Sequence, residues 1–244
     1  MPLIKTAAAL SALAVVATPL KISPAPRDPW AGSGTLPAQS CREPALISGG
    51  VARPQEYLRA MVKCLDKAWN GHFAKARKPF SKPKVVYFDA PQDRICGLPW
   101  PEGIAAFYCT ARRTLVFPLT GDWIEGRTDL LPLKVAAHEY GHHLQTLTGI
   151  RAAYERGRAT AERGRRYELQ ADCLSGVFLG AAWKSLPRAA KDWAALLETV
   201  KASGDDTYRT HGTGASRVYW LTRGYTTAKP ASCDTWSAPA SRVS

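Results

Sequence analysis

The stretch "LPLKVAAHEYGHHLQTLTG", residues 131–149, predicts a helix whose polar side carries three histidines and a glutamate. Apolar residues recur along it at intervals of three and four, as on the buried side of an amphipathic helix, and Gly149 is a typical helix end. The recurring residues are Leu133, Ala136, Ala137, Tyr140, Leu144 and Leu147. This helix is therefore expected to bury its apolar side in the core, and the question is which of its histidines can share a site.

The pattern HExxH runs from His138 to His142. Residues four apart share one face of a helix, so the two imidazoles can bind one tetrahedral metal ion, and neutral imidazole suits zinc. Glu139 follows the first histidine and takes the position of the general base in HExxH sites. His143 lies about 140° around the helix from His138, which excludes it from the same ligand pair. We interpret His143 as a surface or second-layer histidine.

A second predicted helix, "YELQADCLSGVFLGAAW" at 167–183, carries an acidic pair four residues apart. A catalytic zinc site needs a third protein ligand. The pattern HExxHxxGxxH would supply a histidine, but the chain has Gln145 and Thr148 at the required positions. A carboxylate remains: Glu168 has the longer reach and is the expected ligand, while Asp172 is expected to accept a hydrogen bond from a ligand imidazole. The reverse assignment, with Asp172 as the ligand, stays open.

The remaining pattern predicts an α+β fold, a small antiparallel sheet or hairpin packed on a mainly helical domain. The β-branched and aromatic residues at 84–89 predict a strand, and two apolar runs around the polar "ARR" predict a hairpin over 104–119. Further helices are expected at 54–76, 188–200 and 216–224.

Length and charge limit the function classes. A chain of 244 residues suits one globular domain, and 33 Lys plus Arg against 20 Asp plus Glu give a formal net charge of +13. Such an excess favours anionic partners: acidic polymers, phospholipid headgroups, nucleic acid or an anionic cell wall. A secreted protein with a cationic surface and no specific polyanion partner fits the charge equally well. No recognisable nucleic-acid module is present, so specific nucleic-acid binding is not expected.

The N-terminal segment is typical of export. Residues 1–20 combine an early lysine with a short uncharged run, as in a signal peptide or a short anchor, and Val15-Val16-Ala17 fits a cleavage site. The run is short for a membrane span, so no integral span is expected after processing. Residues 21–45 form an expected Pro/Gly-rich linker, and 46–240 an expected zinc metallopeptidase domain. We expect secretion, with retention at the cell envelope as an alternative.

Several motifs resemble the family described as putative neutral zinc metallopeptidases. They are "AAHEYGHHLQTLTGI", "ELQADCLSGVF", "GDD", "HGT", "SRVYWLTRGY" and "CDTW", in this order, preceded by "CG" at 96–97 and "FYC" at 107–109. The resemblance covers about 95–236. It implies a zincin-like peptidase with His138, His142 and Glu168 as zinc ligands and Glu139 as the catalytic base. The arginine-rich segment between the motif helices and residues 30–94 depart from the pattern, which leaves substrate preference open.

Six cysteines are expected to form disulfides in an oxidising compartment, and sequence alone permits fifteen pairings. We hypothesise that Cys96 and Cys109 close a loop, that Cys173 and Cys233 tie the tail to the second motif helix, and that Cys41 pairs with Cys64. The absence of a CxxC pair in the sequence argues against a structural zinc ribbon.

Peptide hydrolysis at such a site needs a donor for the tetrahedral oxyanion and a place for the substrate backbone. His211, in "RTHGTG", is the catalytic candidate for the oxyanion, with Tyr140, Tyr167 and Tyr219 as weaker ones and a merely structural loop histidine as the alternative. Asp205 and Asp206 are expected to shape the same loop. "TLVFP" at 114–118 is the strand expected to form a sheet edge that pairs with an extended peptide or protein substrate.

Three functions fit these features. The leading one is a secreted zinc endopeptidase. The second is a catalytically silent zincin fold that binds cell-wall or other anionic surface polymers, and the retained Glu139 argues against it because a structural site needs no base. The third is a hydrolase of a non-peptide amide, which would use the same chemistry.

Overall fold

The structure is a computed structural model of the chain and describes residues 28–45, 50, 52–100, 103, 105–204 and 210–244. The expected signal peptide at 1–20 and the loop residues Asp205 and Asp206 lie outside the described residues. Within the described part, no helix has the length and apolar character needed to cross a membrane.

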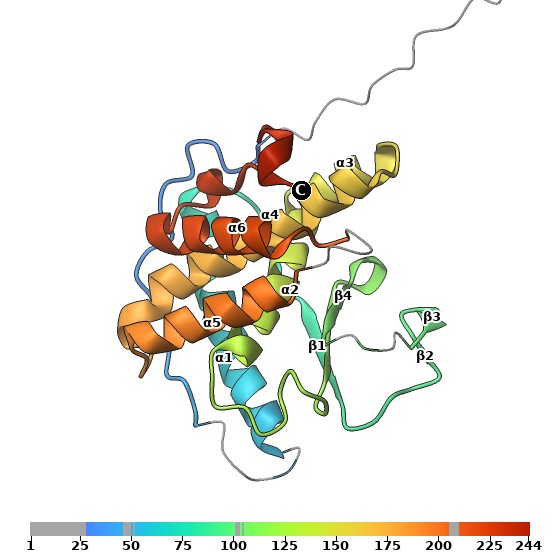
Figure 1. Ribbon diagram of the computed structural model, residues 1–244, viewed down its shortest axis with the longest axis vertical. Coiled ribbons are helices and arrows are strands. Elements are labelled where there is room, and N and C mark those ends of the chain that lie inside the picture. The colour runs from blue at the N-terminus through green and yellow to red at the C-terminus, as the bar shows by residue number, and fades with distance from the viewer. Residues whose placement is uncertain (1–27, 46–49, 51, 101–102, 104, 205–209) are drawn as a thin grey trace, which may run out of the picture.

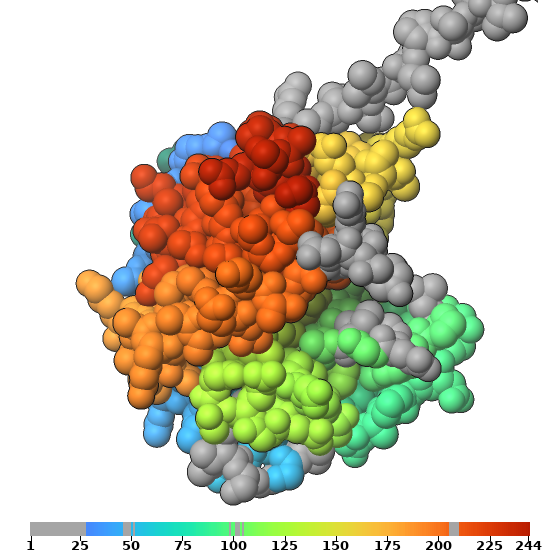
Figure 2. Space-filling model, in the orientation of Figure 1, coloured from blue at the N-terminus to red at the C-terminus, as the bar shows by residue number. Residues whose placement is uncertain are grey.

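The described residues fold into six α-helices beside a small sheet, which confirms the α+β prediction (Figure 1). The helices are α1 (Ala52–Lys75), α2 (Leu131–Leu147), α3 (Ile150–Arg156), α4 (Ala161–Ala182), α5 (Ala190–Ala202) and α6 (Gly214–Thr227). The strands are β1 (Lys84–Phe88), β2 (Arg94–Ile95), β3 (Leu98–Pro99), β4 (Phe107–Cys109) and β5 (Thr114–Pro118). Figure 2 shows the orange α5–α6 layer above the yellow-green segment that leads into α2, with the green sheet to one side.

The main sheet has the strand order β1-β5-β4. β4 and β5 form the predicted antiparallel hairpin, but β1 pairs with β5 in parallel, so the sheet is mixed rather than wholly antiparallel. The prediction that "TLVFP" forms the edge is wrong. These residues are β5, the central strand, because they pair on both sides, and the edge beside α2 is β4. The buried side chains of Leu115 and Phe117 fit a central position.

α2 passes through the middle of the molecule (Figure 1), and 13 of its 17 residues are therefore buried. Pro132 lies in its first turn, where its missing N–H costs no hydrogen bond. At Gly149 the backbone turns left-handed with φ 78°, which ends α2 and begins α3. Gly141 lies against α4: a Cβ there would be 3.1 Å from the Cα of Ala171. The two motif helices therefore cross with their backbones close together.

α4 and α6 approach even more closely. A Cβ at Gly176 of α4 would lie 2.1 Å from the carbonyl oxygen of Leu221, and one at Gly224 of α6 would lie 2.0 Å from that of Cys173. Both distances are far inside van der Waals contact, so only glycine fits either position. This contact places α6 directly behind the acidic motif of α4.

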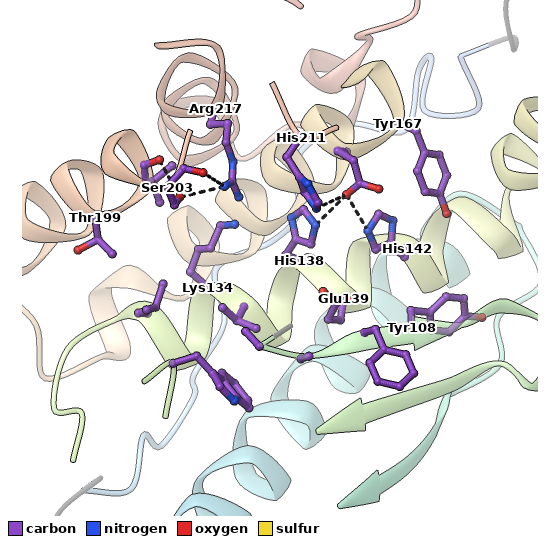
Figure 3. A pocket seen from close by; sticks show the side chains of 18 of the residues that line it. Tyr108, Lys134, His138, Glu139, His142, Tyr167, Thr199, Ser203, His211 and Arg217 are labelled. Atoms are coloured by element: carbon purple, nitrogen blue, oxygen red, sulfur yellow. Dashed lines mark hydrogen bonds and ion pairs between the residues drawn. The ribbon is translucent and has the colours of Figure 1, made fainter. Parts of the chain in front are cut away.

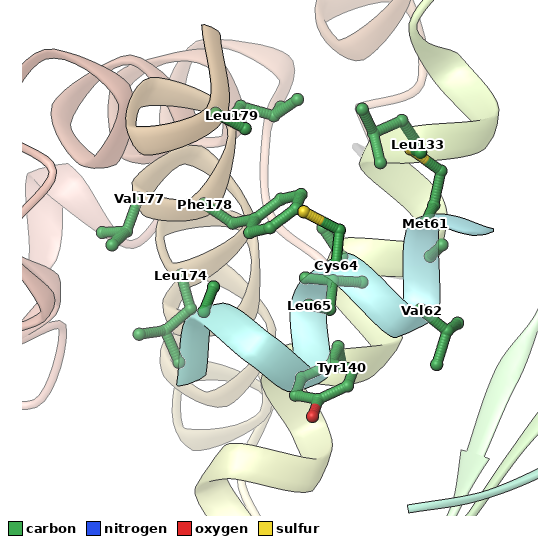
Figure 4. Close-up of a cluster of buried hydrophobic side chains, with 14 of the residues drawn as sticks. Met61, Val62, Cys64, Leu65, Leu133, Tyr140, Leu174, Val177, Phe178 and Leu179 are labelled. Atoms are coloured by element: carbon green, nitrogen blue, oxygen red, sulfur yellow. The ribbon is translucent and has the colours of Figure 1, made fainter. Parts of the chain in front are cut away.

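The largest apolar cluster joins α1, α2 and α4, and Figure 4 shows their side chains meeting between the helices. Its members include Met61, Leu65, Leu133, Tyr140, Leu174 and Phe178, all essentially inaccessible to solvent. At about 25 cal/mol per Å² of apolar surface, this burial is the main stabilising term for the packing of α2. The core thus holds α2, the helix that carries HExxH, in place through its apolar side.

Three disulfides connect the periphery to this core: Cys41–Cys64, Cys96–Cys109 and Cys173–Cys233, the three pairs hypothesised above. Residues 28–45, expected to belong to a linker, pack on the helices: Trp30 is buried against Trp69 and Phe73. The backbone N–H of Leu36 also donates to the carbonyl of Ala228. This stretch is part of the folded structure.

Candidate metal centre

A cavity of about 550 Å³ lies along the polar face of α2 (Figure 3). β4 and the residues before it form one wall, and α4, α5, α6 and the loop at 211 form the others. The ionisable residues that line it are Tyr108, Lys134, His138, Glu139, His142, Arg151, Tyr167, Glu168, His211 and Arg217. The residues that the sequence singled out for zinc chemistry thus meet in one cavity, apart from Asp172, which lies behind its wall.

His138, His142 and Glu168 converge at the centre of this cavity. One carboxylate oxygen, Glu168 Oε2, lies 3.3 Å from His138 Nε2 and 3.2 Å from His142 Nε2. The three potential ligand atoms all lie within 4.8 Å of one another. The helical spacing within α2 brings the two imidazoles together, and the crossing of α2 with α4 brings the carboxylate to them.

The other nitrogen of each imidazole is already hydrogen-bonded. Asp172 Oδ1 accepts from His138 Nδ1 at 2.8 Å, and Gln145 Oε1 lies 2.8 Å from His142 Nδ1. Because the Gln145 amide nitrogen donates elsewhere, to Tyr167 O and Gln170 Oε1, its oxygen is the acceptor. Both imidazoles therefore carry a proton on Nδ1 and, when neutral, present the Nε2 lone pair to the cavity. Two nitrogen lone pairs and a carboxylate that face one point fit a zinc ion.

The protonation of the metal-free site follows from these contacts. Burial acts to raise the pKa of Glu168, but His142 and His138 outweigh it and hold that pKa well below its usual range. Burial acts to lower the pKa of His142, and the Glu168 carboxylate outweighs it and raises that pKa to about 9. The Glu168 carboxylate therefore favours the protonated form of His142 at neutral pH.

Asp172 lies one turn beyond Glu168 on α4 and is fully buried. Besides His138, it accepts a hydrogen bond from Lys134 Nζ at 2.6 Å and from Arg217 Nε at 2.9 Å. Burial acts to raise its pKa, but the charges of Arg217 and Lys134 hold that pKa well below its usual range. Its position fits the expected support of a ligand imidazole, and it is not one of the converging ligand atoms.

Glu139 lies in the wall of the cavity beside the two histidines and is 8 % exposed. Burial raises its pKa above the usual value, partly offset by His142 and His138. A carboxylate with a raised pKa accepts protons more readily, as a general base must.

His211 reaches the same point from the loop before α6. Its Nε2 lies 3.5 Å from Glu168 Oε2, its ring faces that of His138 at a centroid distance of 6.3 Å, and its side chain is 47 % exposed. Burial lowers its pKa. It lines the open side of the cavity, where an incoming substrate would meet it.

Two of the weaker oxyanion candidates lie elsewhere. The Tyr140 hydroxyl donates to Asp66 at 2.7 Å within the core, and Tyr219 is not among the described residues that line the cavity. Tyr167 does line it, with its ring stacked on His142 at a centroid distance of 4.8 Å.

His143 is completely buried, so the surface interpretation is wrong. Its Nε2 donates to the carbonyl oxygen of Ser81 at 2.7 Å, and its Nδ1 lies 3.0 Å from the Tyr108 hydroxyl. Burial lowers its pKa to about 4. It joins α2 to the sheet side of the core, on the face away from Glu168.

Sequence reasoning missed Lys134, Arg217 and Gln145. Lys134 left a usable signal: it lies four residues before His138, so 134, 138 and 142 share one helix face in an otherwise apolar context. Gln145 was considered only as the residue that breaks the third-histidine pattern. Arg217 lies in the motif "SRVYWLTRGY", but its spacing does not point to Asp172, because the contact of α6 with α4 brings the two side chains together.

Comparison with known proteins agrees with this centre. The model of the family described as "Putative neutral zinc metallopeptidase" matches residues 35–236. The uncharacterized protein YpfJ of Escherichia coli (strain K12) is 28 % identical over 213 residues, which cover 78 % of this chain and 74 % of that protein. The uncharacterized proteins Mb2605 of Mycobacterium bovis and Rv2575 of Mycobacterium tuberculosis are each 31 % identical over 189 residues, 65 % of this chain and 64 % of theirs. No solved structure matches. The chain belongs to the putative neutral zinc metallopeptidase family.

Proposed function

We propose that this family member is a secreted zinc-dependent endopeptidase. The observation that carries the proposal is the convergence of His138 Nε2, His142 Nε2 and the Glu168 carboxylate, with Asp172 and Gln145 fixing the two imidazoles. His138, His142 and Glu168 would hold the zinc ion, with Asp172 as the support of His138. A bound zinc ion would lower the pKa of a water molecule and polarise the scissile carbonyl.

The chain's own residues supply the proton transfers. The Glu139 carboxylate takes a proton from the attacking water and returns it to the nitrogen of the leaving amine. Its buried position and raised pKa support this role. His211 Nε2 stabilises the oxyanion by donating a hydrogen bond from the open side of the cavity, and its closeness to Glu168 supports that placement.

β4 is the proposed binding edge for the substrate. It ends the strand order β1-β5-β4, and Phe107 and Tyr108 line the cavity directly. A free strand edge binds an extended peptide through backbone hydrogen bonds, which give affinity with little sequence preference. This supports a protein or peptide substrate over an anionic surface polymer.

Export is part of the proposal. Residues 1–20 would be the signal peptide, or a short anchor, and would bring the chain to an oxidising compartment outside the cytoplasm. The three disulfides support this, because such bonds persist in oxidising compartments. The folded domain would include the packed residues 28–45, since the family match begins at residue 35.

The test is turnover of casein and of a peptide library by zinc-loaded protein, with and without a chelator, for wild type and Glu139→Gln. We expect the substitution to lower kcat by at least about a hundredfold, because it removes the proton acceptor. Zinc content, measured by mass spectrometry, should stay at one equivalent. Glu198→Gln, an exposed residue of α5, is the matched control and should behave as wild type.

The outcomes separate the alternatives. One equivalent of zinc without turnover in either protein would support a silent zincin fold. Turnover that survives both the chelator and Glu139→Gln would exclude the zinc mechanism. Cleavage of model amides that are not peptides, with none of casein, would support a non-peptide amide hydrolase.

A further inference from the structure

The cavity continues beyond the metal centre toward α5, and its wall there is cationic. Lys134 and Arg217 approach from α2 and α6 and both line the cavity (Figure 3). Asp172, the carboxylate that both contact, is fully buried behind them and is not part of the described lining. The two cations therefore lie between the cavity and their shared anion.

The carboxylates that line the described cavity are Glu139 and Glu168, and both belong to the metal centre. Around Lys134 the wall is completed by hydroxyl and apolar groups: Trp123, Leu131, Val135, Thr199, Val200 and Ser203. An ammonium carries three protons, and its bond to Asp172 uses one. Lys134 thus lines a mostly apolar wall in which an additional anion would be attracted in a low-dielectric setting.

We propose that this wall is a carboxylate subsite, which gives the enzyme a preference for substrates with an acidic group next to the scissile bond. The inference rests on the proposed peptidase function. Lys134 supplies the attraction, Arg217 holds Asp172 in place behind it, and the apolar residues pack against the methylene groups of the substrate side chain. The acidic group can be an aspartate or glutamate side chain or the terminal carboxylate of the substrate.

The distance along α2 agrees with this position. Lys134 lies four residues before His138, about 6 Å along the axis of α2. An extended peptide advances about 3.3 Å per residue, so the residue adjoining the scissile bond, or the next one, would lie opposite Lys134. Asp172 bridges the two side chains through a single oxygen, which fixes the ammonium beside the first proposed ligand.

The sharpest test adds a charge to the wall without touching the ligands or Asp172. Thr199, on α5, lines the same cavity as Lys134 (Figure 3), and within the described part of the chain its hydroxyl donates to Ala195 O of its own helix at 3.1 Å. Thr199→Glu introduces a carboxylate, and Thr199→Gln is its control of equal size. Two pairs of peptides are compared. The members of the side-chain pair carry Glu or Gln beside the cleaved bond, and the members of the terminal pair end at that position in a free carboxylate or an amide.

We expect wild type to favour the acidic peptide by about ten- to hundredfold in kcat/KM, the factor for a hydrogen bond to a charged group. Thr199→Glu should remove this preference and Thr199→Gln should retain it. Lys134→Met should also remove it, and Lys191→Met, on the exposed side of α5, should not. Comparing the side-chain pair with the terminal pair shows which source of carboxylate the subsite takes.

Equal kcat/KM for both members of every peptide pair, or identical preferences in Thr199→Glu and Thr199→Gln, would overturn the proposal. A binding experiment tests the subsite independently of the proposed peptidase function. Calorimetric titration of the zinc-loaded protein with the uncleavable pair N-acetylglutamate and N-acetylglutamine should show tighter binding of the glutamate compound, lost in Thr199→Glu. If no peptide is cleaved, the peptidase function fails while this titration still decides the subsite.

Discussion

Two carboxylates one turn apart on α4 have opposite surroundings. Glu168 is 20 % exposed and faces imidazole nitrogens, whereas Asp172 is fully buried and faces the Lys134 ammonium and the Arg217 guanidinium. The described partners of Glu168 are imidazoles, whose charge depends on protonation, whereas those of Asp172 include an ammonium and a guanidinium. Closeness to histidine therefore does not distinguish a metal ligand from its support: the distinction is whether the carboxylate's charge is already balanced.

The largest expected effect comes from Asp172→Asn. Removing the anion takes the carboxylate away from the buried Lys134 ammonium and from the largely buried Arg217 guanidinium, so the free energy of unfolding should fall by about 3–5 kcal/mol. Glu168→Gln should cost less than half as much in metal-free protein, because Glu168 is partly exposed and His142 can release its proton. Urea denaturation in the presence of a chelator measures both variants. An equal loss in the two would show that the clusters do not differ.

The histidines of α2 also differ in their surroundings, and the dependence of stability on pH should show the effect of the buried His143. His143 has a pKa of about 4 in the folded chain and about 6.5 in an unfolded one, so below pH 6.5 the unfolded state binds the extra proton. Its contribution of about 3 kcal/mol is thus present above pH 6.5, decreases as the pH falls and is gone below about pH 4. His143→Gln should unfold with a flatter pH dependence across this window. Parallel profiles for the two proteins would contradict the assignment.

Gln145 tests whether His142 depends on its neighbour as His138 depends on Asp172. Gln145→Leu removes the acceptor for His142 Nδ1, and zinc affinity should fall by about 10–100-fold, the usual effect of losing such a partner. Competition with a chromophoric chelator measures the dissociation constant. Gln92→Leu, at an exposed site, should leave it unchanged. Unaltered affinity in Gln145→Leu would mean that the imidazole needs no fixed tautomer.

The smallest effect is expected from an exposed ion pair of similar length. Arg53 Nη1 lies 2.9 Å from Glu56 Oε2, as close as Arg217 Nε to Asp172, but both side chains are about half exposed. Arg53→Ala should change the free energy of unfolding by no more than about 0.5 kcal/mol. A loss of the size expected for Asp172→Asn would show that distance, not burial, decides these clusters.

The sequence predicted what depends on local periodicity. The helix that bears HExxH was expected at 131–149 and runs from Leu131 to Leu147, and the strand at 84–89 is β1, Lys84–Phe88. The acidic helix begins earlier than expected, at Ala161, because Thr160 caps it by accepting from Arg163 N. The short α3 was not predicted, since Gly149 ends one helix and immediately precedes another.

What depends on contacts between distant segments could not be predicted. The parallel pairing of β1 with β5 is set by tertiary packing, so a run that looked like an edge became the central strand. The converging triad could be anticipated because two patterns of four-residue spacing were enough to identify it. Arg217 could not, because its place beside Asp172 depends on two glycines that bring α6 onto α4.

The Cys96–Cys109 bond has a consequence for where the molecule can work. It ties the β2–β3 turn to the last residue of β4, the strand whose side chains line the cavity. A newly made chain with reduced thiols lacks this bond, so the loop between the two cysteines has more conformational freedom and holds β4 less firmly. The proposed substrate edge would therefore be completed by oxidation, which would leave the enzyme latent among the proteins of the compartment where it is synthesised.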